Sequence, residues 1–439
     1  MKKSVSGIVA SVLLAGGACF ANSPGSIVGW GQNAHGETNP PAGLTCVTQF
    51  SAGSYHNLAL QGDGSVMAWG WNNYGQCSVP ASLGSCTQVG AGSWHSLVLR
   101  SDGTVRAWGL NNQGQIDVPV SLSGVTQVHG GASHSLAVKT GGTVVCWGGN
   151  QWGQSSVPVG LTDVVQAVTH LSWHNTALRT NGSVVCWGQN LNGQIDVPTD
   201  LPRAVQVAGG EQHSLALLTD GTVRAWGISA NGISTPPAGL SNVVAIVGGG
   251  FHSVALQANG AVVCWGSGQA GGTGDHQFGQ CVVPNNLGGV SQIGAGYQHT
   301  LAMVGPATTV SGVQPISGPT EGGTQLAIIG TGFTPDAAVT IGGVPASNVI
   351  YISPNRLTAI TPPGVPGITS VKVNCASTDA FYYRPYCGSD LDQNGSVDGG
   401  DMSILLLDWG TCYSSVQASQ SKDPPGLLAD EPAQNPVQR

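Results

Sequence analysis

The sequence predicts an all-β protein whose main part is a seven-bladed β-propeller, and three observations support this. Seven Trp-Gly dipeptides follow one another at intervals of 39 or 40 residues. Seven histidines in the context Gly-x-x-His, or a close variant, follow the same interval, and Gly-containing turn dipeptides separate strand-length apolar runs. A constant period of this length is typical of repeat architectures. The tryptophans are Trp30, Trp69, Trp108, Trp147, Trp187, Trp226 and Trp265, and the histidines are His56, His95, His134, His174, His213, His252 and His299.

The two ends of this repeat region complement each other. The first Trp-Gly has no histidine segment before it, and the last histidine segment, 296–303, has no Trp-Gly after it. We therefore expect residues 27–31 to supply the missing strand to the segment 290–304, which closes a ring of seven units. Closure removes the exposed sheet edges that favour aggregation.

One unit, from Val89 to Leu122, illustrates the expected blade. A short apolar stretch leads to the Gly-x-x-His turn, the run 96–100 follows, and Asp102-Gly103 separates it from the run 104–108. Asp-Gly and its counterparts are the residues that tight hairpin turns require. Each unit should contain three or four antiparallel strands. Their alternating directions place the Gly-x-x-His turn and the Asn-x-x-Gly loop after Trp-Gly on one side of the ring.

The repeated unit reads Gly-x-x-His-Ser-Leu-Ala-Leu, then Asp-Gly-x-Val-x-Ala-Trp-Gly, then Asn-x-x-Gly-Gln. It resembles the regulator of chromosome condensation repeat, in the short bacterial form of the propeller-type beta-lactamase inhibitory protein. The resemblance covers residues 27–305 and implies a propeller domain over 22–307. Because such repeats occur in exchange factors, light sensors and inhibitors, the resemblance favours no single function.

The amino terminus has the features of a secretory signal peptide over residues 1–21. Two lysines precede an apolar run, 8–14, and small residues lead to Ala21. A lipoprotein with Cys19 as the lipidated residue is the alternative, although the leucine usual three residues before such a cysteine is absent. We expect bacterial export to the periplasm, the cell surface or the medium. No later stretch has the roughly 18 consecutive apolar residues of a membrane span.

Charge excludes one class of partner. Without Lys2 and Lys3 the chain has 11 basic and 21 acidic side chains, a net charge of −10 with neutral histidines. Nucleic-acid binding depends on basic patches, so we expect no nucleic-acid partner.

Six cysteines of the propeller divide into two groups. Cys146, Cys186 and Cys264 precede the Trp of Trp-Gly, where other units carry Ala, so we expect small buried thiols and no metal cluster. Cys46, Cys77 and Cys86 lie nearer the blade connections, and one pair among them is a candidate disulfide.

A second domain is expected over residues 308–385. Short apolar runs at 326–329, 339–341, 349–352 and 371–373, separated by turn residues, fit a small β-sandwich. The segments 318–324, 329–333, 341–343, 361–363 and 381–383 resemble an immunoglobulin-like, plexin and transcription factor (IPT/TIG) domain. The resemblance implies a spacer or an adhesive module, with the spacer favoured.

A calcium-binding module is expected over residues 386–413. Oxygen-bearing residues occupy positions 1, 3, 5, 9 and 12 of a loop with Gly395 at position 6, which is the pattern that Ca²⁺ requires. The predicted ligands are Asp390, Asp392, Asn394, Ser396 through its carbonyl, Asp398 and Asp401. An Asp at position 12 resembles dockerin repeats, but a dockerin has two, so cohesin binding is left open. Cys387 and Cys412 bracket the module and suggest a disulfide, and residues 414–439 should form a disordered tail.

The recurring histidines are expected to be structural, each bonded to the backbone of the neighbouring blade, because every unit carries one. The chain shows no Ser-His-Asp triad or carboxylate pair outside its repeats, so we predict no enzyme.

Positions that vary between units are better candidates for recognition, and many are aromatic. The insertion 270–277 lengthens a loop on the side of the ring where the Gly-x-x-His turns are expected. The alternative is that these rings only fill gaps between blades. The predicted partner-binding residues are Tyr55, Tyr74, Trp94, Trp152, Trp173, Phe251 and Phe278.

These observations favour an exported, monomeric, non-enzymatic scaffold that binds a protein or a glycan through this aromatic face. An inhibitor of an extracellular enzyme is the first alternative, as the beta-lactamase inhibitory resemblance implies. A regulator of the guanine nucleotide exchange type is the second, and the signal peptide argues against it. A hydrolase or lyase acting on cell-wall glycans is the last.

Overall fold

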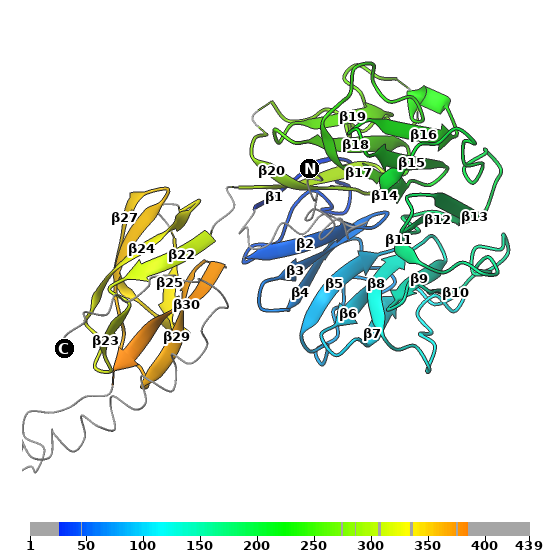
Figure 1. The fold of residues 1–439 in the computed structure, drawn as a ribbon. Helices are drawn as coiled ribbons and strands as arrows, with labels where there is room; N and C mark the ends of the chain where they lie inside the picture. Colours follow the sequence, from blue (N-terminus) through cyan, green and yellow to red (C-terminus); the bar gives the residue numbers. More distant parts are fainter. Residues whose placement is uncertain are drawn as a thin grey trace, which may run out of the picture.

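The computed structural model describes residues 26–384, apart from 45, 274, 286, 306–308, 334–336 and 375. The described strands form two all-β regions, a ring of three-stranded sheets followed by a two-sheet sandwich (Figure 1). The predicted signal peptide, the calcium module with its ligands and its Cys387–Cys412 disulfide, and the tail lie outside the described residues.

Seven antiparallel three-stranded sheets are formed by the described residues, and we number them as blades 1 to 7. Blade 1 has β2 (Val47–Ala52), β3 (His56–Gln61) and β4 (Val66–Gly70), and blade 2 has β5 (Cys86–Ala91), β6 (His95–Arg100) and β7 (Val105–Gly109). Blade 3 has β8 (Val125–Gly130), β9 (His134–Lys139) and β10 (Val144–Gly148), and blade 4 has β11 (Val164–Val168), β12 (His174–Arg179) and β13 (Val184–Gly188). Blade 5 has β14 (Ala204–Gly209), β15 (His213–Leu218) and β16 (Val223–Gly227), followed by the 3₁₀ turn η1 (Ala230–Gly232), and blade 6 has β17 (Val243–Gly248), β18 (His252–Gln257) and β19 (Val262–Gly266). Blade 7 has β20 (Val290–Ala295), β21 (His299–Val304) and β1 (Ser26–Gly31).

The blades follow one another around a ring. The first strand of each blade contacts the first strand of the next, and β20 of blade 7 contacts β2 of blade 1 (Figure 1). Within blade 7, β1 pairs antiparallel with β21, from Ser26 opposite Val304 to Gly31 opposite His299. The predicted pairing of residues 27–31 with the segment 290–304 is confirmed.

The hairpin turns have the predicted backbone conformation. Gly103 has φ +78°, and its counterparts in the other blades also have positive φ, a region that favours glycine. The Asp102 carboxylate accepts a hydrogen bond from the amide of Thr104, which stabilises the turn.

The apolar interior of the ring is divided into seven clusters, each between two adjacent blades and each containing one Trp of Trp-Gly. Trp108 of blade 2, for example, belongs to a cluster with Leu58 and Leu60 of blade 1. Its indole Nε1–H donates to the carbonyl of Gln76, in the loop after β4 (2.9 Å). Gly109 has φ +107°, and a Cβ there would collide with the carbonyl of Trp94. The Trp therefore serves the junction between blades, and the Gly permits a close backbone approach within blade 2.

The seven histidines hold neighbouring blades together. His56 Nε2 lies 3.0 Å from the hydroxyl of Ser96 in blade 2, and that hydroxyl donates to the Gln76 carbonyl (2.8 Å). Since the hydroxyl proton is used there, the hydroxyl accepts from Nε2–H. His299 makes the equivalent bond to Oδ1 of Asn57, from blade 7 back to blade 1. The structural role holds, but the partner is a side chain and not the backbone that we expected.

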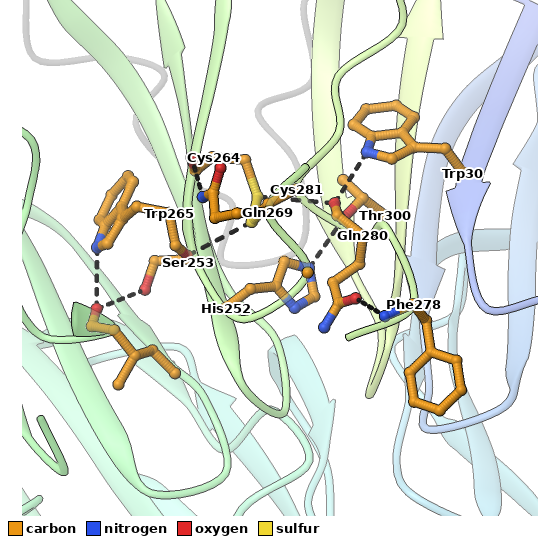
Figure 2. Close-up of a disulfide and its surroundings, with 12 residues drawn as sticks. Trp30, His252, Ser253, Cys264, Trp265, Gln269, Phe278, Gln280, Cys281 and Thr300 are labelled. Carbon is orange, nitrogen blue, oxygen red and sulfur yellow. Dashed lines mark hydrogen bonds between the residues drawn. A yellow bond between two sulfur atoms is a disulfide. The ribbon is translucent and has the colours of Figure 1, made fainter. Parts of the chain in front are cut away.

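The junction of blades 6 and 7 shows these contacts in one view (Figure 2). His252 Nε2 contacts the Thr300 hydroxyl (2.9 Å), which donates to the carbonyl of Gln280 (2.8 Å). The same carbonyl accepts the indole N–H of Trp30 (2.8 Å). One carbonyl thus joins the Trp-Gly and Gly-x-x-His motifs across the junction.

Burial explains the glycine of Gly-x-x-His and the charge state of its histidine. A Cβ at Gly92 would collide with the ring of His95. All seven rings are fully or almost fully buried, and this burial lowers their pKa to about 3, or to about 4 for His134. The histidines are therefore neutral at pH 7.

A glutamine on the first strand of most blades supplies a further junction, which was not predicted. Gln88 donates through Nε2 to the carbonyl of Val128 in blade 3 (3.3 Å) and accepts through Oε1 from the Val128 amide (2.9 Å). Ala245 replaces this glutamine in blade 6.

The cysteines require two corrections. Cys146 and Cys186 are free thiols and partly buried, as expected, but Cys264 forms a disulfide with Cys281. The expectation of a free thiol at Cys264 was therefore wrong. Cys281 directly follows Gln280, as Cys77 follows Gln76, but eight inserted residues move it away from the regular spacing and conceal this equivalence.

The candidate disulfide among Cys46, Cys77 and Cys86 was also wrong. Cys77 and Cys86 are free, and Cys46 is disulfide-bonded to neither.

The second region has a four-stranded sheet packed on a five-stranded one. The first contains β22 (Thr309–Gln314), β24 (Gln325–Thr331), β28 (Arg356–Ile360) and β27 (Ser347–Ser353), and the second contains β23 (Ser317–Pro319), β30 (Ala376–Arg384), β29 (Gly367–Val373), β25 (Val339–Ile341) and β26 (Val344–Pro345). The four predicted apolar runs lie in β24, β25, β27 and β29. A single apolar cluster, which includes Leu326, Leu357 and Phe381, fills the space between the sheets. Within the described part of the chain, no helix is long and apolar enough to cross a membrane.

Candidate functional site

The turns before the second strands and the loops after the third strands lie on one face of the ring, as predicted. Trp94 lies in the turn between β5 and β6, and Tyr74 lies in the loop after β4. Their ring centroids are 5.9 Å apart. Trp71, in the same loop as Tyr74, meets Trp94 edge to face at 4.7 Å.

Aromatic rings form a continuous chain on this face, over blades 6, 7, 1 and 2. Tyr55 is central, because it stacks on Trp94 at 5.3 Å and contacts Tyr297 at 5.6 Å. Phe251 extends the chain from Tyr297, at 5.1 Å. The ring contacts join Phe251, His276, Tyr297, Tyr55, His35, Trp71, Tyr74 and Trp94.

This chain of rings borders an open cavity of about 460 Å³, which we call the aromatic basin. A pocket of this size can hold a small ligand or a single side chain. Its lining residues are Ser54, Tyr55, Tyr74, Ser93, Trp94, Leu110, Asn112, Gln113, Gln115, Ala132, Ser133, Gln151, Leu171, Trp173, Glu211 and Tyr297.

The structure brings together four of the seven predicted partner-binding residues. Tyr55, Tyr74, Trp94 and Trp173 line the basin, and Phe251 reaches it only through its contact with Tyr297.

The other two predicted residues stand apart from the basin. Trp152 and Phe278 are 42% and 47% exposed and do not line it. Tyr74 is also 47% exposed, so these rings do more than fill gaps between blades.

Two basin residues were missed from sequence, Glu211 and Tyr297. Glu211 lies in the turn between β14 and β15, and its carboxylate is hydrogen-bonded to the Tyr297 hydroxyl. One carboxylate oxygen, Oε2, is buried and has no hydrogen-bond partner among the described residues. Burial raises the pKa of Glu211 to about 7, against a smaller lowering by the Tyr297 bond. Burial, and then the Glu211 charge, raises the pKa of Tyr55 and Tyr297.

Blade 4 contributes an irregular segment to the basin. The interval from His134 to His174 is 40 residues, one more than in a regular unit, and Leu171 has φ +54°. Leu171 lines the basin. His170 reaches across the ring and its Nε2 hydrogen-bonds to the carbonyl of Ala295 in blade 7. A narrower cavity of about 40 Å³, lined by His129 and His170, lies between the first strands of the blades.

The insertion 270–277 lies on the same face, as predicted. His276 stacks on Phe251 at 3.6 Å, and its Nδ1 lies 2.7 Å from the Gln298 amide nitrogen. The Cys264–Cys281 disulfide closes the base of this insertion (Figure 2). The described residues contain no group of three or more His, Cys, Asp and Glu side chains that could hold a metal ion.

Comparison with protein families supports both regions. The regulator of chromosome condensation (RCC1) repeat matches residues 47–76, 86–115, 125–154, 172–194, 204–233 and 243–271, and the IPT/TIG domain matches residues 308–386. The chain carries RCC1 repeats and an IPT/TIG domain. The fourth repeat match begins only at residue 172, directly after the irregular segment that contains His170 and Leu171. Neither match reaches residues 390–401, so neither supports the dockerin-like calcium loop.

Solved structures support the propeller fold. Prp20p of Saccharomyces cerevisiae, studied for its binding to Gsp1p and histones, is 21% identical with a TM-score of 0.54, covering 64% of this chain and 92% of that one. Human WBSCR16 is 18% identical with a TM-score of 0.51, covering 63% and 98%. At such identities the likeness shows the fold alone.

One curated human protein, fibrocystin-L, is 43% identical over 65 residues. The match covers 15% of this chain and spans only 2% of fibrocystin-L, so it shows a short shared segment.

Proposed function

We propose that this protein is an exported, non-enzymatic scaffold, a closed seven-bladed propeller that binds a protein or glycan partner in its aromatic basin. The observation that carries the proposal is that recurring and variable positions of the repeat have different roles. The Trp and His of each unit are used in junctions between blades, whereas residues that differ between units line the basin. The IPT/TIG domain would then act as a spacer.

The composition of the basin supports binding and not only packing. Tyr and Trp are the residues that anchor protein interfaces and stack on sugars, because each combines a large apolar surface with a polar atom. Five rings, those of Tyr55, Tyr74, Trp94, Trp173 and Tyr297, face one cavity. Amides and hydroxyls between them offer hydrogen bonds.

The Cys264–Cys281 disulfide supports export, because disulfides persist in oxidising compartments. The proposed signal peptide at 1–21 would direct it there. We include in the proposal a single Ca²⁺ site, formed by the loop 390–401, as part of a carboxyl-terminal attachment module, and a monomeric state.

The test compares the full chain with a variant that carries Trp94→Ala and Trp173→Ala. Each protein is immobilised and screened against an array of bacterial glycans and against extracellular proteins of the producing cell. We expect the double variant to lose its partner by at least tenfold, because the anchoring rings are gone. Val120→Ala, at a fully exposed position outside the basin, is the control and should change binding less than twofold. Unchanged binding by the double variant would reject the basin as the site.

A second candidate is inhibition of an extracellular enzyme. The exposed rings of Trp152 and Phe278 favour it, because they widen the aromatic surface beyond what a small ligand would need. Inhibition assays against a panel of beta-lactamases test it, and an absence of inhibition at micromolar protein would exclude that enzyme class.

A further inference from the structure

We propose that the aromatic basin binds an organic cation, the side chain of a lysine or arginine presented by a protein partner, with Glu211 as its counter-charge. This inference rests on the proposed function and narrows it, since it selects a protein over a glycan and names the chemistry of the contact.

The charge of the basin wall favours a cation. Glu211 is the one charged side chain among the described lining residues, and no Lys, Arg or His is among them. The remaining polar groups of the lining are neutral amides, hydroxyls and phenols. A carboxylate in an otherwise neutral concavity gives a negative potential that attracts a cation and repels an anion.

The aromatic lining favours a cation as well. The faces of Trp and Tyr rings carry negative quadrupole potential and attract ammonium and guanidinium groups within about 6 Å. Trp94, Trp173, Tyr55 and Tyr297 come from four different blades and line the same cavity as Glu211. The arrangement has the composition of an aromatic cage with an acidic residue, and its volume of about 460 Å³ admits one long side chain.

Glu211 itself lacks a partner that a cation would provide. The Tyr297 hydroxyl is hydrogen-bonded to the carboxylate, while Oε2 is buried and unpaired among the described residues. A buried acceptor without a donor is costly, and an N–H donor from an ammonium or guanidinium group would remove that cost.

The protonation of Glu211 gives the inference a distinctive signature. Burial raises its pKa to about 7, so the free basin is partly protonated at neutral pH. A bound cation favours the ionised carboxylate, and binding therefore releases a proton. Affinity should be constant above about pH 8 and fall about tenfold per unit below about pH 6, because the proton must then be expelled. Binding of an uncharged sugar would release no proton.

The titratable groups around Glu211 are two phenols, His170 and Glu37, and beyond the phenols the chain of aromatic rings includes His35 and His276. Tyr297 of blade 7 and Tyr55 of blade 1 have raised pKa values and stay neutral. His170, which lines the narrower cavity between the first strands, has a pKa lowered by burial. Glu37, which acts on Tyr55, is buried in the loop after β1, and blades 4 and 6 face Glu211 with the non-titrating Trp173 and Gly249.

The test uses titration calorimetry on the full chain with N-acetyl-lysine methylamide and N-acetyl-arginine methylamide. Measurements at pH 7 in phosphate and in MOPS, whose ionisation enthalpies differ and neither of which is a net cation, report the proton released. N-acetyl-norleucine methylamide is the neutral control ligand and choline is the competing small cation. We expect at least one of the two cationic amides to bind at least tenfold more tightly than norleucine amide, with up to about half a proton released.

Two variants decide the role of Glu211. Glu211→Gln keeps the shape and should weaken binding of the cationic amide at least tenfold, with no proton release and no pH dependence. Asp200→Asn, at an exposed carboxylate outside the basin, should bind as wild type. Tryptophan fluorescence checks that each variant is folded. If Glu211→Gln is misfolded, Glu211→Asp is used in its place, and it should retain part of the affinity because it keeps the charge.

Three results would overturn the inference: equal binding of norleucine amide, wild-type affinity in Glu211→Gln, or choline bound tenfold more tightly than both amino-acid amides. If neither cationic amide binds while the Trp94 and Trp173 double variant still loses its partner, the cation inference fails and the proposed function stands.

Discussion

The propeller and the sandwich of this chain both bury the faces of β-sheets, but their interiors differ. The sandwich has one continuous apolar cluster between its two sheets. The propeller divides its apolar side chains into seven separate clusters, one at each junction between blades. Buried histidines, glutamines and hydroxyls bridge the same junctions. The difference teaches that a ring of small sheets needs directional polar contacts, because no single cluster spans it.

The two interiors should therefore respond differently to pH, and this is the largest effect that we predict. The seven recurring histidines of the propeller have pKa values lowered by burial to about 3 or 4, whereas in unfolded chains the value is about 6.5. Between these values the unfolded state binds more protons, so stability is complete above pH 6.5 and is lost as pH falls. At pH 5 each histidine should cost about 2 kcal/mol. Residues 308–385 contain no histidine.

Urea unfolding at pH 7.5 and at pH 5, followed by tryptophan fluorescence, measures this. The sandwich contains no tryptophan, so the signal reports mainly on the propeller. We expect the midpoint of the fluorescence transition to fall steeply, while the β signal of the sandwich in circular dichroism persists. An unchanged fluorescence midpoint would contradict the neutral histidine network.

A smaller effect should follow from substitution of one junction tryptophan. Trp108→Ala should lower the free energy of unfolding by about 3–5 kcal/mol, because it leaves a cavity between blades 1 and 2. Trp108→Phe keeps most of the ring and loses the bond to the Gln76 carbonyl, and should cost less. Phe381→Ala is the counterpart in the sandwich and should leave the fluorescence transition in place. A fluorescence midpoint shifted equally by Phe381→Ala would show that the two regions unfold as one unit.

The smallest effect concerns the glutamine bridge. Gln88→Ala should cost about 1–2 kcal/mol, because the Val128 amide loses its acceptor in a buried strand. Blade 6 carries Ala245 at this position, which indicates that the ring tolerates one such loss. Val120→Ala, at a fully exposed loop position, is the control and should shift the free energy of unfolding by less than about 0.5 kcal/mol. Equal values for both variants, from urea unfolding at pH 7.5, would mean that the bridge contributes nothing.

Much of the fold could be predicted from the sequence because the same residue pattern recurs in seven units. The pairing of residues 27–31 with the segment 290–304, the turn at Asp102-Gly103 and the framework role of Trp108 all followed from comparing units. The bonding partner of His56 did not, since Ser96 is 40 residues away and becomes a neighbour only when the ring forms.

The candidate site was only partly predictable, because several of its residues differ from those at the equivalent positions of the other units. Glu211 and Tyr297 each occur once at their positions and are 86 residues apart, so no pattern links them before the ring closes. The Cys264–Cys281 disulfide was hidden by the inserted loop. His170 was hidden by the one-residue lengthening of blade 4, which also interrupts the match to the RCC1 repeat.

The pairing of β1 with β21 has a mechanical consequence. The sandwich follows β21 in the chain, so a pull on the carboxyl-terminal part reaches the ring at Val304, the end of β21. This strand is the centre of its blade, hydrogen-bonded to β1 on one side and to β20 on the other. Tension must therefore break the hydrogen bonds to β1 and to β20 together before the ring opens. The last strand of the propeller is thus a mechanically resistant attachment point for the region that follows.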